Sequence, residues 1–198
     1  MQTNFKSFRV LILTVPLLLV FSNCGYNELQ GLDEEVKASW AEVQNQYQRR
    51  NDLIPNLVEV VKGYAKHEKD TLTAVVEARA KATQTVLPAQ ALSDPKAFEN
   101  FQKAQGGLTQ ALSRLMVVSE RYPDLKANSN FRDLQAQLEG TENRVTVARK
   151  RYIEKVADYN KKVRFFPTNL TAKFLLGLQT RETFTASEEA KTPPKVKF

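Results

Sequence analysis

Residues 49–68 read RRNDLIPNLVEVVKGYAKHE, and this stretch joins two amphipathic helical segments. Its apolar residues recur every three or four positions, so they share one face of a helix. Pro55 lacks a backbone N–H, and its ring collides with the preceding helical turn. We therefore expect the helix to kink at Pro55, or to end there and restart with Asp52 as N-cap. A kink between two core-facing helices is the simpler interpretation, and a binding site at the kink is the alternative.

The composition is that of one folded helical domain. The chain has 198 residues, of which 42% are hydrophobic and 26% are charged, ordinary values for a globular domain. Only 7 residues are glycine, and the apolar pattern is long and periodic, so the sequence predicts an all-α fold. The net charge is +7, but basic residues are interleaved with acidic ones. This interleaving argues against a nucleic-acid partner.

The N-terminal segment predicts attachment to a membrane. Lys6 and Arg9 precede an apolar run at residues 10–21, which is too short to span a bilayer and matches a secretory signal peptide. The single cysteine, Cys24, follows this run and resembles the acylated cysteine of a bacterial lipobox, although Phe21 and Asn23 depart from its commonest form. We expect a signal peptide at 1–23, then a lipidated Cys24 in a short linker at 24–27.

A lipidated Cys24 would place the protein on the cell membrane or outer membrane, facing the periplasm or exterior. The alternative is an uncleaved signal anchor that tolerates Pro16. Either form holds the rest of the chain outside the inner membrane on a tether.

A helical bundle domain is predicted over residues 28–167. Its four expected helices cover residues 28–51, 53–86, 95–122 and 128–165. The last would be about 57 Å long at 1.5 Å per residue. Trp40 lies on the apolar face of the first helix and is expected in the core. The tail at 168–198 begins with an apolar patch, either a short helix on the bundle or one at a membrane surface, and ends in a charged, proline-rich stretch expected to be extended.

No residue pattern predicts catalysis. His67 and Glu68, expected in the middle of the second helix, resemble part of a zinc-peptidase motif, but Thr71 stands where the second histidine ligand would be. The chain has no other histidine. We therefore expect no catalytic residues, no metal site and no cofactor, and His67 as an ordinary helix residue.

Four polar residues form a candidate interaction site. Glu142 and Arg149 lie close to the apolar stripe of the last helix, and buried polar groups require partners. Arg79 and Glu120 on other helices are candidate partners. A structural ion-pair network is the simpler interpretation, and a ligand- or lipid-binding site built on these groups is the alternative.

Long spaced motifs carry a family resemblance that covers nearly the whole chain after the leader. They are Gly25-Tyr26-Asn27, Trp40, Arg49-Arg50, residues 52–58, Lys62-Gly63-Tyr64-Ala65, His67-Glu68, Ala78-Arg79, Glu120, residues 122–128, Phe131, Leu134, Glu142-Asn143-Arg144, Ala148-Arg149, Tyr159-Asn160, Phe166-Pro167 and residues 190–198. With these motifs the chain resembles the LemA family of bacterial envelope-associated proteins. The resemblance implies a long antiparallel helical bundle behind an N-terminal membrane anchor. It implies no activity, because the family has no assigned catalytic residues.

Three functions compete on these grounds. The first is a non-enzymatic, membrane-tethered module that contacts other envelope proteins, favoured because no nucleophile–base pair or phosphate-binding loop is found. The second is a ligand or lipid binder that uses Pro55, Glu142 and Arg149. The third is a hydrolase, which would need His67 to meet an acidic residue from a distant helix. Heptad-like spacing is also compatible with a homo-oligomer.

Overall fold

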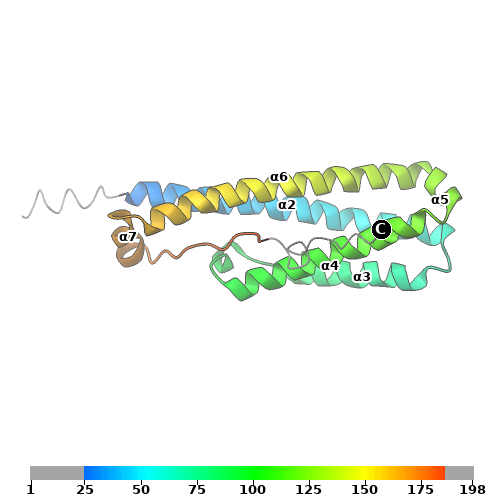
Figure 1. Ribbon diagram of the computed structural model, residues 1–198, viewed down its shortest axis with the longest axis horizontal. Helices are drawn as coiled ribbons and strands as arrows, with labels where there is room; N and C mark the ends of the chain where they lie inside the picture. The colour runs from blue at the N-terminus through cyan, green and yellow to red at the C-terminus, as the bar shows by residue number, and fades with distance from the viewer. Residues whose placement is uncertain (1–24, 186–198) are drawn as a thin grey trace, which may run out of the picture.

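The computed structural model describes residues 25–185, and every regular element in this range is helical (Figure 1). The two longest helices, α2 (Tyr26–Tyr64) and α6 (Ser129–Arg164), run antiparallel along the whole bundle. The shorter helices α3 (Lys69–Gln84) and α4 (Pro95–Ser119) form a second hairpin beside them. The predicted all-α antiparallel bundle is confirmed, whereas the predicted signal peptide and Cys24 lie outside the described residues.

Short elements join and end the long helices. They are the 3₁₀ turn η1 (Ala89–Ala91), helix α5 (Pro123–Ala127), helix α7 (Thr168–Leu170) and the π-helical turn η2 (Thr171–Leu175). The side chain of Asp94 accepts hydrogen bonds from the amides of Lys96 and Ala97 at the start of α4. Asn128 accepts one from the amide of Phe131 at the start of α6. Both residues act as N-caps, a position at which aspartate and asparagine are preferred.

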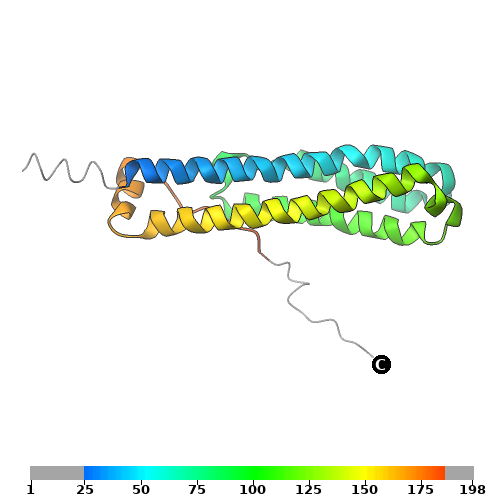
Figure 2. The same cartoon turned by 90° about the horizontal axis from the view of Figure 1, so that it is seen from above.

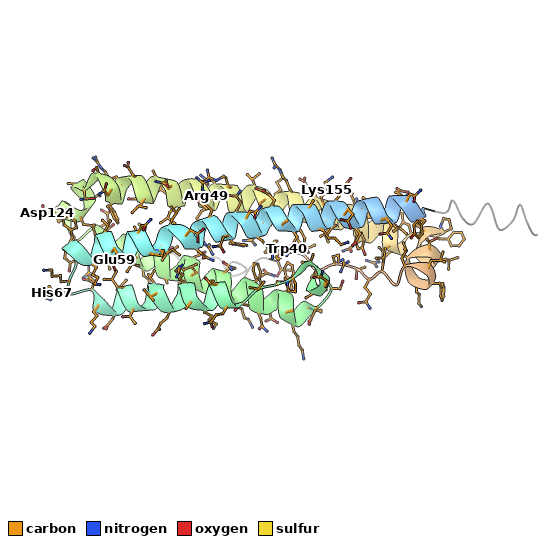
Figure 3. All side chains as sticks on the ribbon, turned by 180° about the vertical axis from the view of Figure 1, so that it is seen from behind. Trp40, Arg49, Glu59, His67, Asp124 and Lys155 are labelled. Atoms are coloured by element: carbon orange, nitrogen blue, oxygen red, sulfur yellow. The ribbon has the colours of Figure 1, made fainter. Side chains whose placement is uncertain are left out.

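The first two helices differ from the sequence expectation. Helix α2 does not end near residue 51 but continues through Pro55 to Tyr64. The helix ends at Tyr64 and the next one begins at Lys69, so His67 and Glu68 lie in a loop and not in the middle of a helix. His67 is exposed at the end of the bundle where Asp124 of α5 also lies (Figure 3).

The continuity of α2 has a physical reason on α3. In a helix the amide of residue 55 would bond to the carbonyl of Asn51, and proline has no N–H to give. The Nε–H of Arg79 on α3 donates to that carbonyl oxygen at 2.9 Å. Asn51 is buried, so its carbonyl needs a partner within the protein. Arg79 therefore replaces the hydrogen bond that Pro55 removes.

The core consists of two apolar clusters along the bundle. One lies where α3 and α4 pack on α2 and α6, next to α5, and includes Ile54, Leu108 and Phe131. The other surrounds Trp40, which is 1% exposed and lies midway along α2 (Figure 3). The indole Nε1–H of Trp40 donates to the carbonyl oxygen of Leu87 at 2.9 Å. The expected core position of Trp40 is confirmed.

The tail completes the second cluster. Because α3 and α4 are shorter than α2 and α6, they leave one end of the long pair uncovered (Figure 2). After η2 the chain turns back, and Phe184 inserts among aromatic rings, with its centroid 6.1 Å from that of Trp40 and 5.7 Å from that of Tyr152. The amide of Glu182 also donates to Leu92 O at 2.8 Å. The tail is thus part of the folded domain as far as Thr185.

An ion pair ties this tail to α2. Arg181 Nη2 lies 2.9 Å from Asp33 Oδ1, and the two side chains are only 13% and 6% exposed. Burial acts to raise the pKa of the Asp33 carboxyl, but hydrogen bonds from Lys37 and Arg181 outweigh it and hold the pKa below the ordinary value of 3.8. Asp33 therefore favours the folded tail only while it is charged.

We predict an energetic coupling between Pro55 and Arg79. Arg79→Met should lower the free energy of unfolding by about 1–3 kcal/mol, because it leaves a buried carbonyl without a donor. In a Pro55→Ala background the alanine amide restores that donor, so the same Arg79 change should cost much less. Urea unfolding of the wild type, the two single variants and the double variant measures this coupling. Equal costs in both backgrounds would show that Arg79 does not replace the missing hydrogen bond.

We also predict that the tail detaches when Arg181 is replaced. Arg181→Met leaves Asp33 with a single cation and should shift the emission of Trp40, the chain's one tryptophan, to the red as Phe184 leaves it. Glu35→Gln is the control, because it breaks the exposed pair with Lys155 at 2.7 Å and should leave the emission unchanged.

Acid should mimic this change in the wild type. Because the folded pKa of Asp33 is lowered, its contribution is present above the ordinary value of 3.8 and is lost as the pH falls through the lowered value. The red shift should therefore begin below about pH 3.8 and not near neutral pH. A shift centred near neutral pH would show that a group other than Asp33 controls the tail.

Candidate functional site

An open groove runs between α4 and α6. The closest neighbours are α2 with α6 and α3 with α4, so the edge between α4 and α6 is the open side of the bundle. A cleft of about 950 Å³ occupies this edge, and a second of about 450 Å³ continues it toward α5. Thr109 and Glu142 line both clefts. We call the two together the α4–α6 groove.

A buried arginine forms the floor of this groove. The side chain of Arg50 on α2 is 1% exposed. Its Nη1 donates to Glu142 Oε1 at 2.8 Å and to Thr109 Oγ1 at 3.0 Å, and its Nη2 donates to Gln105 Oε1 at 2.5 Å. Its guanidinium also lies 5.0 Å from the centroid of the Tyr47 ring. The cation thus joins α2, α4 and α6 at one point.

The Arg50 cluster leaves hydrogen-bonding capacity facing the groove. Glu142 is 39% exposed, so its carboxylate can turn to another partner while Arg50 stays buried. The Nε of Arg50 is buried and has no acceptor among the described residues. Burial raises the pKa of Tyr47, which also lines the groove, although Arg149 and Arg50 act to lower it. Tyr47 is therefore a neutral hydrogen-bonding group at neutral pH.

The groove changes character along its length. Near the tail its walls carry charge, including the Glu99–Lys103 pair and Arg149, whose guanidinium lies 4.2 Å from the Phe184 ring centroid. Toward α5 the walls include the apolar side chains of Leu112, Met116 and Leu138. An occupant with a polar end and an apolar end would match both parts.

Two adjacent glycines form part of the α4 wall. Gly106 and Gly107 lie inside the helix, where each glycine costs about 1 kcal/mol relative to alanine. A Cβ atom added to either would meet no atom within 4 Å, so packing does not require them. Both line the larger cleft. Because neither glycine has a side chain, they leave this side of the cleft unfilled.

The groove lies in the part of the chain that matches a known protein family. A sequence model of the LemA family matches residues 39–198. The chain belongs to the LemA family. A search of curated proteins finds no match. The LemA match includes Arg50, both glycines and Glu142, so the groove lies within the family region.

The four predicted site residues of this LemA protein fall in three places. Glu142 and Arg149 line the groove. Arg79 instead bonds to Asn51 on α2, and Glu120 pairs with Lys126 at 2.6 Å near α5. Pro55 is not among the residues that line the groove. The structure therefore brings together only the two residues that come from α6.

Arg50 was missed as a site residue, although the sequence contains a signal for it. The buried positions of α2 step by three or four residues, and Arg50 occupies the step between Tyr47 and Ile54. A charged residue on a core stripe indicates a buried cation that needs partners. Its partners Gln105 and Thr109 are uncharged and lie on another helix, so spacing within α2 gives no sign of them.

Neither a metal cluster nor a spanning helix appears in the described range. Residues 25–185 contain no group of three or more His, Cys, Asp or Glu side chains placed to hold a metal ion. None of the helices in this range is long and apolar enough to cross a membrane.

We predict that the bundle stays stable when the whole polar network at the floor of the groove is replaced, but not when Arg50 alone is replaced. Arg50→Met should lower the free energy of unfolding by roughly 2–4 kcal/mol, because Gln105 and Glu142 lose their shared donor. The triple variant Arg50→Met, Gln105→Leu, Glu142→Met should recover most of this loss, since apolar groups of similar size often replace buried charges without cost. Chemical denaturation measures both. A triple variant as unstable as the single one would assign the arginine a purely structural role.

Proposed function

We propose that this LemA-family protein is a non-enzymatic binding module that presents the α4–α6 groove to a segment of another envelope protein. The lipidated Cys24 would tether it to a membrane. The observation that carries the proposal is the open groove itself, with a buried arginine on its floor and two glycines in its wall. A bundle evolved only for packing would gain stability by filling this space.

The side chains in the groove favour binding over catalysis. Its titratable groups are the Glu99–Lys103 pair, the Arg50–Glu142 pair, Glu139, Arg149 and a neutral Tyr47, and no ion pair or hydrogen bond among them forms a nucleophile with an adjacent base. His67 is exposed in the loop after α2 and does not line the groove. The groove offers hydrogen bonds, charge and apolar surface, which are the means of recognition.

The shape of the groove favours an elongated occupant. Along α4 it extends from Glu99 to Met116, about 25 Å at 1.5 Å per residue. An extended or helical peptide segment fits such a channel between two helices. The alternative occupant is a lipid, favoured by Leu112, Met116 and Leu138 in the second cleft, with its polar head toward Arg50.

The tether rests on the sequence. The basic flank, the apolar run at residues 10–21 and the single cysteine directly after it are typical of a lipoprotein leader. Mass spectrometry of the N-terminal peptide from membranes tests this part, with Cys24→Ala as control. Acyl chains on a mature Cys24 are expected, and an intact, unacylated leader would contradict the lipoprotein form.

Crosslinking in living cells tests the groove. A benzoylphenylalanine at Gln110, an exposed position in the groove, should form a discrete adduct with an envelope protein. The same probe at Val76, which is 49% exposed on α3, should not. An adduct to a phospholipid at Gln110 would favour the lipid alternative instead.

Filling the groove supplies the matched control. With the probe at Gln110, Gly107→Trp should abolish the adduct, because the indole occupies the cleft, whereas Gly63→Trp on α2 should leave it intact. Both glycines have open space around an added Cβ, so the first side-chain atom of either tryptophan meets no neighbour. Gly107→Ala should instead raise the free energy of unfolding by about 1 kcal/mol and keep the adduct. Equal adducts at Gln110 and Val76, or an adduct that survives Gly107→Trp, would contradict the proposal.

A further inference from the structure

The end of the bundle where α2 begins and α6 finishes exposes a cluster of large apolar side chains. Phe165 is 63% exposed, Phe166 80%, Phe174 74% and Leu175 72%, and Leu170 between them is 41% exposed. They come from the turn directly after α6, from α7 and from η2, and α6, α7 and η2 pack on one another at this end (Figure 1). Exposed apolar groups gathered in this way mark a surface that meets another apolar phase. We call these five residues the apolar end.

Basic residues surround the apolar end. Between Asp158 and Leu175 the chain has four basic residues, Lys161, Lys162, Arg164 and Lys173, and one acidic residue, Asp158 itself. Lys162 pairs with Glu28 at 2.7 Å. Arg164 and Lys173 are exposed, and no carboxylate among residues 25–185 pairs with them. The end therefore carries positive charge beside aromatic rings, and Lys173 Nζ lies 5.6 Å from the centroid of Phe174.

This composition fits the surface of an anionic bilayer. Phenylalanine and leucine side chains enter the boundary between head groups and acyl chains, and lysine and arginine reach the phosphates above them. Each basic residue near an anionic membrane contributes about 1 kcal/mol. A purely apolar protein partner would leave Arg164 and Lys173 without counter-charges, so the charge pattern favours phospholipid.

The chain also enters the bundle at this end. Gly25 has a φ of 77°, and a Cβ added there would collide with the Thr168 side chain in α7. The residue that follows Cys24 is therefore held against the element that carries the apolar end, at the tip shown in Figure 2. A lipid on Cys24 would lie about one residue, or 3.8 Å of chain, from this tip.

We propose that the apolar end inserts into the head-group region of an anionic phospholipid bilayer. This rests on the tether in the proposed function and adds a second contact. The end of the long axis faces the membrane, so α2 points away from it and carries its far end to a height of about 58 Å. The bundle thus stands on the bilayer, with the α4–α6 groove facing sideways along the membrane.

The test uses the full chain on phospholipid vesicles. Benzoylphenylalanine replaces Phe174, an aromatic for an aromatic, and irradiation should give an adduct with phospholipid. The same probe at Val117, 69% exposed on α4, is the matched control and should give none. The yield at residue 174 should be higher on vesicles with phosphatidylglycerol than on phosphatidylcholine alone, and Lys173→Gln should reduce that yield up to about fivefold.

Flotation of the same vesicles separates this proposal from the tether. A chain that floats but gives no phospholipid adduct at residue 174 keeps its tether and overturns the inserted end. A chain that does not float contradicts both. An adduct between two copies of the chain at residue 174 would overturn the proposal and show that the apolar end is a dimer contact. Equal phospholipid adducts at residues 174 and 117 would also overturn it, because contact would then not be confined to this end.

Discussion

The length of this bundle depends on a single hydrogen bond to the carbonyl of Asn51. Pro55 removes the amide that this carbonyl would accept in a regular helix, and Arg79 on α3 supplies another donor at 2.9 Å. With this bond in place, α2 continues past the proline as one helix of 39 residues and packs along α6, which has 36. The same bond links α3 to α2, and the apolar cluster that includes Ile54 and Val75 packs the two helices together along the same region. Continuity of one helix and attachment of another thus share one contact.

The groove exists because the two helical hairpins differ in length and because only one helix of the shorter hairpin packs closely on the longer hairpin. Helices α3 and α4 have 16 and 25 residues, while α2 and α6 have 39 and 36. The short hairpin attaches to the long one mainly through α3, which leaves the α4–α6 edge open. At one end the tail fills the missing layer by placing Phe184 beside Trp40. Phe184 and Thr185 also line the larger cleft, so the tail forms part of the groove wall.

Much of the fold could be predicted from sequence because apolar periodicity specifies which faces are buried. The all-α bundle, the core position of Trp40 and the caps Asp94 and Asn128 all follow from local patterns. A kink or a break was expected at Pro55, but the helix continues through that residue and ends only before residues 65–68, because the donor that replaces the missing amide comes from another helix. The site was predicted only in part for the same reason. Glu142 and Arg149 lie on one helix, whereas Arg50, Gln105 and Thr109 meet only in three dimensions.

Arg50 is the strongest reason to regard the groove as more than a packing defect. Removing a guanidinium from water is costly, and an apolar side chain of similar volume would serve a helix seam equally well or better. Here the cation is 1% exposed, yet its carboxylate partner Glu142 remains 39% exposed on the groove wall. A network built for rigidity alone would bury both partners and satisfy the Nε of Arg50, which has no acceptor among the described residues. The unequal burial instead keeps a positive charge fixed beneath a carboxylate that can move, which is suited to exchanging an internal partner for one on an incoming segment.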